Sequence, residues 1–204
     1  MSEIFLNKQT SIDLNLLVST RLLIQGASKS GKSWLLRRIC EKSFGKIQQI
    51  IIDLEGEFLS LRELYDYVII GPDGDWPAKI EYAKAFAKYT MRDGFSVIID
   101  LSDFNKPDRE LFLKEFIDQL FKTPEKYRRP CLVAIDESHT YCPQKGITAC
   151  SESVINLMSR GRKYGLCGIL LTQRLSKLNK DAVSECGNKF VGMTFMDIDQ
   201  KRAL

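Results

Sequence analysis

The sequence predicts an α/β fold in which a mostly parallel central sheet is flanked by helices. Short apolar runs rich in β-branched residues alternate along the chain with longer amphipathic stretches. Several runs are continuously apolar, which is typical of strands covered on both faces. A phosphate-binding motif follows the first of these runs, where a helical pattern begins. These features together predict a P-loop nucleotide-binding fold.

The strands and helices are expected in alternating order. The stretches expected to form strands are Thr20–Gln25, Ile47–Leu54, Tyr67–Ile70, Ser96–Leu101, Cys131–Ile135, Gly168–Thr172 and Lys189–Thr194. The stretches with apolar residues at helical spacing and the length of a crossover helix are Lys32–Ser43, Ala78–Met91, Asp108–Lys122 and Ser151–Tyr164. No linker or repeat divides the chain, so we expect one domain over residues 1–204, with a lead-in at 1–18 and a strand or tail at 190–204.

Composition excludes several protein classes. The 204 residues are 44% hydrophobic and 27% charged, with 6 Pro and 13 Gly, which excludes collagen-like, low-complexity and disordered chains. A balance of 30 Lys and Arg against 26 Asp and Glu leaves a charge of +4. This charge permits a nucleic-acid partner without arguing for one.

Cysteine spacing and hydropathy indicate a reduced, cytoplasmic protein. The chain has no C-x-x-C pair and a single histidine, His139, so the common zinc spacings are absent and buried, reduced thiols are expected. No signal peptide is recognisable, and no apolar run approaches the roughly 18 residues of a transmembrane segment. The cysteines are Cys40, Cys131, Cys142, Cys150, Cys167 and Cys186.

The most specific motif is a complete G-x-x-x-x-G-K-S after the run that ends at Gln25. Glycines let such a loop wrap around phosphate, while backbone N–H groups and a helix N-terminus supply a fixed positive field. Lys32 is expected to reach the β- and γ-phosphates of ATP, and Ser33 to ligate Mg²⁺. The residues of the loop are Gly26, Ala27, Ser28, Lys29, Ser30, Gly31, Lys32 and Ser33.

A bound Mg²⁺ also needs a carboxylate from a neighbouring strand end, and two aspartates are candidates. Asp53 and Asp136 each follow an apolar run, but only Asp136 is followed by a second carboxylate, Glu137. This pair supplies both metal ligation and activation of the attacking water. Asp53 begins a D-x-x-G that suits a GTPase switch, yet the chain has no Asn-Lys-x-Asp element for reading guanine. The residues therefore favour Asp136 and Glu137.

Two further signals each have two interpretations. Gln173 follows an apolar run at the strand edge where α/β folds bind ligands, and it either contacts the γ-phosphate or simply ends the strand. Arg160 and Arg162 close a predicted helix. They either complement the helix dipole, or one of them acts as an arginine finger on a neighbouring subunit.

Taken together, the motifs resemble those of the FtsK–HerA family of ring-forming, DNA-translocating ATPases. The resemblance extends from about Ile12 to Phe195 in order and spacing. Besides the phosphate loop, it rests on Ile12-Asp13-Leu14-Asn15-Leu16-Leu17, Asp53-Leu54-Glu55-Gly56-Glu57, Ile135-Asp136-Glu137-Ser138-His139, Gly161-Arg162-Lys163-Tyr164-Gly165 and Thr172-Gln173-Arg174.

The resemblance implies a fold and a set of roles. The fold is a RecA-like sheet of the additional-strand, catalytic-glutamate (ASCE) type, with extra strands between the two nucleotide motifs. ATP and Mg²⁺ are the implied cofactors, with Glu137 activating water and Gln173 sensing the γ-phosphate. Arg162 becomes the expected finger in trans, with Arg160 second. Two residues expected near the nucleotide, without an assigned step, are Asp53 and Glu57.

The resemblance also implies partners. Cellular members of the HerA branch carry an amino-terminal barrel and further carboxy-terminal segments, whereas this chain looks like a bare motor core. It most resembles the packaging ATPases of archaeal turreted icosahedral viruses. That likeness implies a homo-oligomeric ring, a hexamer or pentamer, that translocates double-stranded DNA into a preformed capsid. The ring would dock on a capsid vertex or a membrane-associated virion protein in the host cytoplasm.

A DNA-moving motor would contact the DNA backbone through cations on two loops that follow nucleotide-site strands, Thr140–Ala149 and Arg174–Lys189. Taken singly, each of these cations fits a solvated surface charge better than a DNA contact. The alternatives to a packaging motor are a cellular HerA-like translocase, a P-loop small-molecule kinase, and a nucleotide-dependent binding module with negligible turnover. The candidate DNA-contacting cations are Lys145, Arg174, Lys177 and Lys180.

Overall fold

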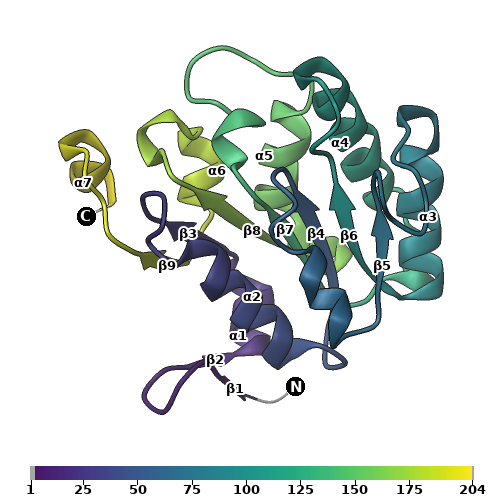
Figure 1. The fold of residues 1–204 in the computed structure, drawn as a ribbon, viewed down its shortest axis with the longest axis horizontal. Coiled ribbons are helices and arrows are strands. Elements are labelled where there is room, and N and C mark those ends of the chain that lie inside the picture. Colours follow the sequence, from purple (N-terminus) through teal and green to yellow (C-terminus); the bar gives the residue numbers. More distant parts are fainter. Residues whose placement is uncertain (1–2, 204) are drawn as a thin grey trace.

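The centre of the molecule is a seven-stranded sheet, seen in a computed structural model that describes residues 3–203 (Figure 1). The strand order is β5-β6-β4-β7-β8-β3-β9, and every neighbouring pair runs parallel. The predicted fold class is therefore confirmed. The strands are β3 (Leu22–Gln25), β4 (Gln48–Asp53), β5 (Tyr67–Ile70), β6 (Ser96–Asp100), β7 (Cys131–Ile135), β8 (Leu166–Thr172) and β9 (Asn188–Val191).

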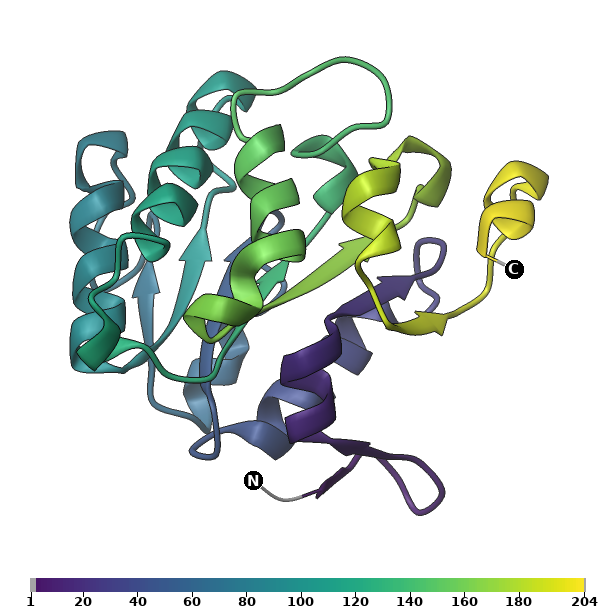
Figure 2. The same ribbon diagram turned by 180° about the vertical axis from the view of Figure 1, so that it is seen from behind.

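Helices cover both faces of this sheet. The core on one face contains side chains of α1 (Leu14–Thr20) and α2 (Lys32–Ser43), and α2 lies in front in Figure 1. The other face, turned to the front in Figure 2, carries α3 (Ala83–Asp93), α4 (Lys106–Leu120), α5 (Ser151–Arg160) and α6 (Lys180–Ser184). Short 3₁₀ turns occupy Leu59–Glu63, Ile80–Tyr82, Glu125–Tyr127, Ser138–Thr140, Gly161–Tyr164 and Leu175–Lys177.

Side chains that alternate along the strands build two apolar cores. In β4, Ile50 and Ile52 face the core that contains Phe112 of α4, whereas Ile51 faces the core that contains Leu36 of α2. These five side chains are at most 1% exposed. Each such burial contributes roughly 1.5–3 kcal/mol to folding. The continuously apolar runs in the sequence therefore correspond to strands that are buried on both faces.

The strand order brings the ends of three motif-bearing strands together. β8 lies between β3 and β7, and Gln25 at the end of β3 pairs with Thr172 at the end of β8. Because these strands are parallel, the phosphate loop, Gln173 and Asp136 leave the sheet at the same edge. The expected extra strands, β4 to β6, come between β3 and β7 in the chain and extend the sheet beyond β7.

The lead-in segment forms a hairpin and a helix over its described residues. Strands β1 (Glu3–Phe5) and β2 (Ser11–Asp13) pair antiparallel, and the Asp13 carboxylate caps α1 by accepting two N–H groups of its first turn. The sequence prediction that a strand begins at Thr20 was wrong. Thr20 ends α1, because the cap starts a helix and the Thr20 hydroxyl donates to Leu16 O at 2.6 Å.

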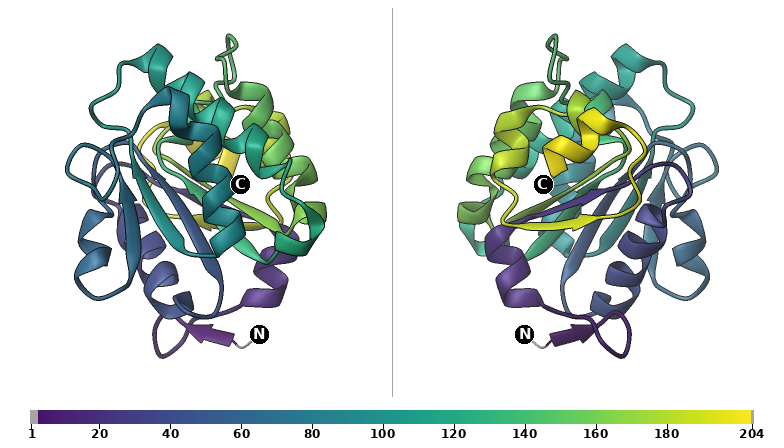
Figure 3. Two further views of the ribbon diagram at one scale, coloured as in Figure 1. Left: turned by 90° about the vertical axis from the view of Figure 1, so that its right-hand side faces the viewer. Right: turned by 90° about the vertical axis from the view of Figure 1, so that its left-hand side faces the viewer.

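The sequence left the segment from residue 190 onward open between a packed strand and a tail. In the structure, β9 ends at Val191, residues 192–196 have no regular secondary structure, and α7 (Asp197–Ala203) follows. Figure 3 shows these elements along the β9 side of the molecule. Residues 1, 2 and 204 of the expected domain lie outside the described residues. Within 3–203, no helix has both the length and the apolar character needed to cross a bilayer.

Candidate nucleotide site

The loop between β3 and α2 has the backbone of a phosphate cradle. Lys29 and Gly31 are in the left-handed region, with φ of 62° and 91°. Left-handed residues alternating with right-handed ones turn successive N–H groups toward one concave side, where an anion binds. A Cβ at Gly26 would collide with the Ser30 hydroxyl, so glycine lets that hydroxyl lie against the start of the loop. The Ser30 Oγ is buried without a hydrogen-bond partner among the described residues, which suits a phosphate oxygen.

Lys32 supplies the cation of this cradle. It is the first residue of α2 and is only 9% exposed, and its ammonium forms no ion pair with a carboxylate in the described part of the chain. A buried cation at a helix N-terminus fits an anionic ligand, because both the helix end and the unpaired ammonium favour a negative charge there. These residues therefore fit the triphosphate of ATP.

A cleft of about 850 Å³ opens beside the loop. Lys32 and Ser33 line it from the phosphate loop, Glu137 and Gln173 from the strand ends, and Glu57 from the segment after β4. Predicted phosphate ligands and predicted catalytic residues thus share one cleft, although they come from distant parts of the chain.

Both carboxylate oxygens of Glu137 are held. Gln173 Nε2 donates to Oε1 at 2.6 Å, and His139 Nδ1 lies 3.2 Å from Oε2. The Glu137 backbone is left-handed, with φ of 45° and ψ of 41°, a conformation that costs a non-glycine residue on the order of 1–3 kcal/mol. Burial by itself would raise the pKa of Glu137, but the hydrogen bonds from His139 and Gln173 and the charge of Lys32 hold that pKa below its ordinary value.

Asp136 has the opposite electrostatic balance. It is 3% exposed, and burial together with the negative charge of Glu137 raises its pKa to about 7. Its Oδ1 accepts the Glu137 N–H at 2.9 Å. A divalent cation would favour the ionised carboxylate, so Asp136 fits the metal ligand expected together with Ser33. When bound, Mg²⁺ supplies charge neutralisation at the phosphates.

Asp53 and Glu57 occupy different places. The Asp53 carboxylate accepts the backbone N–H groups of Glu55, Glu57 and Phe58, the last at 2.8 Å, and Asp53 is fully buried. Asp53 therefore shapes the turn after β4, while Glu57 on that turn lines the cleft.

Comparison with known proteins agrees with this geometry. A family model described as the central domain of helicase HerA matches residues 6–190. This chain belongs to the HerA helicase central-domain family. The expected membership of the FtsK–HerA group of P-loop ATPases is thereby confirmed.

Individual relatives of this HerA-family chain are distant. A probable helicase of Methanocaldococcus jannaschii is 27% identical over 75 residues, which cover 37% of this chain and 15% of that protein. The genome-packaging NTPase B204 from Sulfolobus turreted icosahedral virus 2, in complex with ATP-gammaS, has a TM-score of 0.58 at 16% identity over 90% of this chain and 79% of its own. The cytoplasmic domain of EssC has a TM-score of 0.61 at 14% identity over 99% of this chain and 38% of its own. These structures share the fold of the HerA-family chain.

The candidate arginine fingers lie at the opposite edge of the sheet from the cleft. Arg160 ends α5 and Arg162 lies in the turn before β8, whose amino end is at Leu166. Both are exposed, and the described lining of the cleft includes neither. A finger role for either residue in this family member therefore requires the cleft of another subunit.

The two loops that carry the candidate DNA cations are joined. Gln144 N donates to Lys177 O at 2.6 Å, which ties the loop after β7 to the loop after β8. Lys145, Lys177 and Lys180 are exposed, whereas Arg174 is half-buried and its Nε has no partner among the described residues. The cations therefore lie on two loops that are joined to each other rather than independent.

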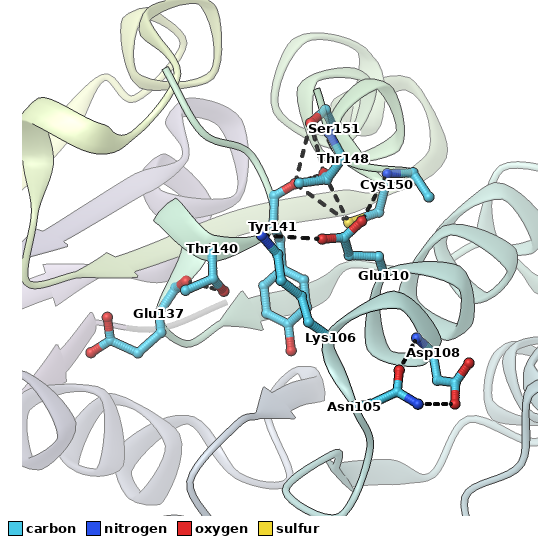
Figure 4. A network of polar contacts seen from close by, with 11 residues as sticks. Asn105, Lys106, Asp108, Glu110, Glu137, Thr140, Tyr141, Thr148, Cys150 and Ser151 are labelled. Atoms are coloured by element: carbon cyan, nitrogen blue, oxygen red, sulfur yellow. Dashed lines mark hydrogen bonds and ion pairs between the residues drawn. The ribbon is translucent and has the colours of Figure 1, made fainter. Parts of the chain in front are cut away.

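The base of the first loop is fixed by the polar contacts of Figure 4. Thr140 donates to Glu137 O at 2.8 Å, and Ala149 N donates to Glu110 Oε2 at 3.1 Å. The Thr148 hydroxyl donates to Tyr141 O. The loop is thus anchored at both ends, one of them beside Glu137.

Sequence reasoning assigned no role to His139. Thr172 Oγ1 lies 3.0 Å from His139 Nδ1 and also accepts the Arg174 N–H at 3.0 Å. One signal was present, because His139 is the only histidine and comes two residues after Glu137. Trp34, which also lines the cleft, carried no such signal.

Proposed function

We propose that this HerA-family chain is a Mg²⁺-dependent ATPase that moves double-stranded DNA, with residues 1–204 acting as one motor domain. The supporting observation is the cleft in which Lys32 and Ser33 face Glu137 and Gln173. In this proposal, water attacks the γ-phosphorus, its proton passes to Glu137, and ADP leaves with the electrons of the broken bond. Lys32 stabilises the phosphate charge, and Gln173 orients Glu137 and contacts the γ-phosphate.

The proposed assembly is a homo-oligomeric ring of six or five subunits. The position of Arg162, and secondarily Arg160, at the sheet edge away from its own cleft supports a finger that acts in trans. Such a finger stabilises charge that develops on the γ-phosphate. A ring that encircles duplex DNA also gives a small domain the processivity that a monomer lacks.

The proposed DNA contacts are Lys145, Arg174, Lys177 and Lys180, because the two loops that carry them are bonded together and start at Glu137 and Gln173. Backbone phosphates are the expected target.

The fold shared with B204, described as a genome-packaging NTPase, supports packaging of a viral genome into a preformed capsid. That role would have the ring dock on a capsid vertex or membrane-associated virion protein in the host cytoplasm. The match to a probable helicase supports a cellular HerA-like translocase as the second candidate.

Phosphate release from ATP, measured with and without linear duplex DNA, tests the proposal. We expect Mg²⁺-dependent release that DNA stimulates, and loss of turnover in Glu137→Gln with nucleotide binding retained. Wild-type turnover in Glu137→Gln would contradict the assignment of the base. Transfer of phosphate to a metabolite without DNA stimulation would indicate a kinase, and binding without turnover would indicate a binding module.

The trans finger has its own test. We expect Arg162→Ala and Lys32→Ala to be inactive alone and to regain part of the activity in mixed rings, since a mixed interface can pair an intact finger with an intact cradle. An Arg162→Ala chain with unchanged turnover would eliminate this residue, and Arg160→Ala is the matched comparison.

A further inference from the structure

The stretch after β9 is bonded to the start of the phosphate loop. Gly192 N donates to Gln25 O at 2.7 Å, and Ala27 N donates to Met193 O at 2.8 Å. The Thr194 hydroxyl donates to Gln25 Oε1 at 3.0 Å. Residues 192–194 therefore follow any movement of residues 25–27, because two hydrogen bonds join the two backbones and a third joins the side chains of Thr194 and Gln25.

The other end of the same stretch holds the loops that carry the candidate DNA cations. Arg202 Nη1 donates to Ser176 O at 2.9 Å, and Nη2 donates to Leu178 O at 2.8 Å and to Gln144 Oε1 at 3.2 Å. The Asp199 carboxylate accepts the Ser176 N–H. Arg202 thus contacts both loops at once.

These polar contacts, rather than apolar packing, hold α7 in place. From residue 192 to residue 202, every side chain is exposed except Thr194, Asp199 and Arg202, and each of these three makes the contacts just described. Phe195 and Ile198 are 71% and 59% exposed, so the helix buries no apolar stripe. A seven-residue helix is too short to be stable alone, so its position depends on Asp199 and Arg202.

We propose that residues 192–203 form a strap that transmits the state of the phosphate loop to the two joined loops, 142–149 and 174–178. Arg202 and Asp199 are its positioning residues. The inference rests on the proposed function only in requiring that the cradle binds ATP. The strap lies beyond residue 190, where the match to the family model ends.

The strap works as a coupling between two sites. A nucleotide in the cradle orders the phosphate loop, which fixes residues 192–194 and, through α7, the acceptors of Arg202. By reciprocity, a ligand that orders the two loops tightens nucleotide binding by the same factor. Without Arg202, the loops keep their mutual bond and the contact of Ser176 N with Asp199, but they lose the three hydrogen bonds by which Arg202 ties both of them to α7.

Hydrogen exchange with and without ATP-gammaS tests the strap without needing DNA. We compare the wild-type chain, Arg202→Ala, and the control Lys201→Ala, which removes the same charge from an exposed neighbour in α7. In the wild type and the control, we expect the nucleotide to slow exchange in 26–33 and, by about tenfold, in 142–149 and 174–178. In Arg202→Ala, we expect the slowing in 26–33 to remain and the slowing in 142–149 and 174–178 to fall well below tenfold, because Asp199 is then the remaining anchor of α7. Arg202→Lys should be intermediate, because one ammonium cannot reach all three acceptors.

The outcomes separate the strap from the proposed function. Nucleotide-dependent slowing of the two loops in Arg202→Ala, equal to that in the control, would overturn the strap. The strap would also be overturned if, in the wild-type chain, ATP-gammaS slowed exchange in 26–33 but not in 142–149 and 174–178. A wild-type phosphate loop that ATP-gammaS leaves unprotected would instead contradict the proposed ATPase. Should Arg202→Ala fail to fold, Asp199→Ala takes its place, because it removes the other contact between α7 and the loop 174–178. The same loss of nucleotide-dependent slowing in the two loops is then expected, and its absence would overturn the strap.

Discussion

Gln173 Nε2 lies 2.6 Å from Glu137 Oε1, and this hydrogen bond joins the ends of β8 and β7 across the floor of the cleft. A glutamine side chain carries two N–H donors, and one of them is used here. The second remains for a γ-phosphate oxygen. The residue expected to sense the nucleotide therefore also orients the residue expected to activate water.

Replacing Gln173 with Ala should lower kcat by about 10- to 100-fold, because a misoriented base loses part of the 10²–10⁴-fold that general-base catalysis supplies. The affinity for ATP-gammaS should fall less than kcat, because one proposed contact with the γ-phosphate is lost while the phosphate loop is untouched. Steady-state phosphate release and a binding titration check both. An unchanged kcat would show that the bond to Glu137 is dispensable.

His139 holds the other oxygen of the same carboxylate, so the two supports should be interdependent. We expect His139→Ala and Gln173→Ala each to leave the Glu137 side chain partly oriented, and the double variant to lose more than the product of the single losses. A double-mutant cycle on kcat measures this. Strictly multiplicative effects would show that the two residues act independently.

Trp34 should report nucleotide binding. Its ring is 76% exposed, directly follows Ser33 and lines the cleft, whereas the chain's other tryptophan, Trp76, is 59% exposed and lies outside the cleft lining. In Trp76→Phe, titration with ATP-gammaS should change the fluorescence of the remaining indole. The matched variant Trp34→Phe should show little change, and a full response there would contradict the placement.

Gly165 should tolerate alanine poorly. Its φ of +80° is left-handed, and a Cβ there would collide with the backbone carbonyl of Arg129. Gly45 has a φ of +73° with nothing within 4 Å of its Cβ position, so it serves as the control. We expect Gly45→Ala to lower the free energy of unfolding by about 1 kcal/mol and Gly165→Ala by at least about 2 kcal/mol. Urea denaturation checks this, and equal losses would contradict the collision.

The six cysteine thiols are free and buried, so they should react slowly in the native chain. Burial raises the pKa of Cys40 and of Cys167 to about 12, which leaves little thiolate near neutral pH. Reaction with a thiol reagent at pH 8 should therefore proceed much faster after denaturation. Rapid modification of a native thiol, located by mass spectrometry, would contradict the burial of that cysteine.

Some features of the site were predictable because they depend on neighbours in the sequence. The phosphate loop is a continuous motif between a strand and a helix, and α2 begins and ends where the pattern predicts. The prediction failed at Thr20, where the cap at Asp13 outweighs the β-propensity of a single residue. The residues alone did not decide whether Arg162 complements the helix dipole or acts as an arginine finger, because no pattern in the neighbouring sequence distinguishes these roles of an exposed arginine.

Periodicity and motif spacing were enough to predict the α/β class, the phosphate cradle and the pairing of Asp136 with Glu137, because each depends on residues close together in the chain. Folding alone brings Gln173 to Glu137 over 36 positions and Arg202 to Gln144 over 58. Those contacts arise because β8 inserts between β3 and β7, and because α7 returns to the same edge of the sheet. Strand order and long-range hydrogen bonds leave no periodic pattern in a sequence. The contacts of residues 192–203 and the two side-chain partners of Glu137 were therefore visible only in the folded chain.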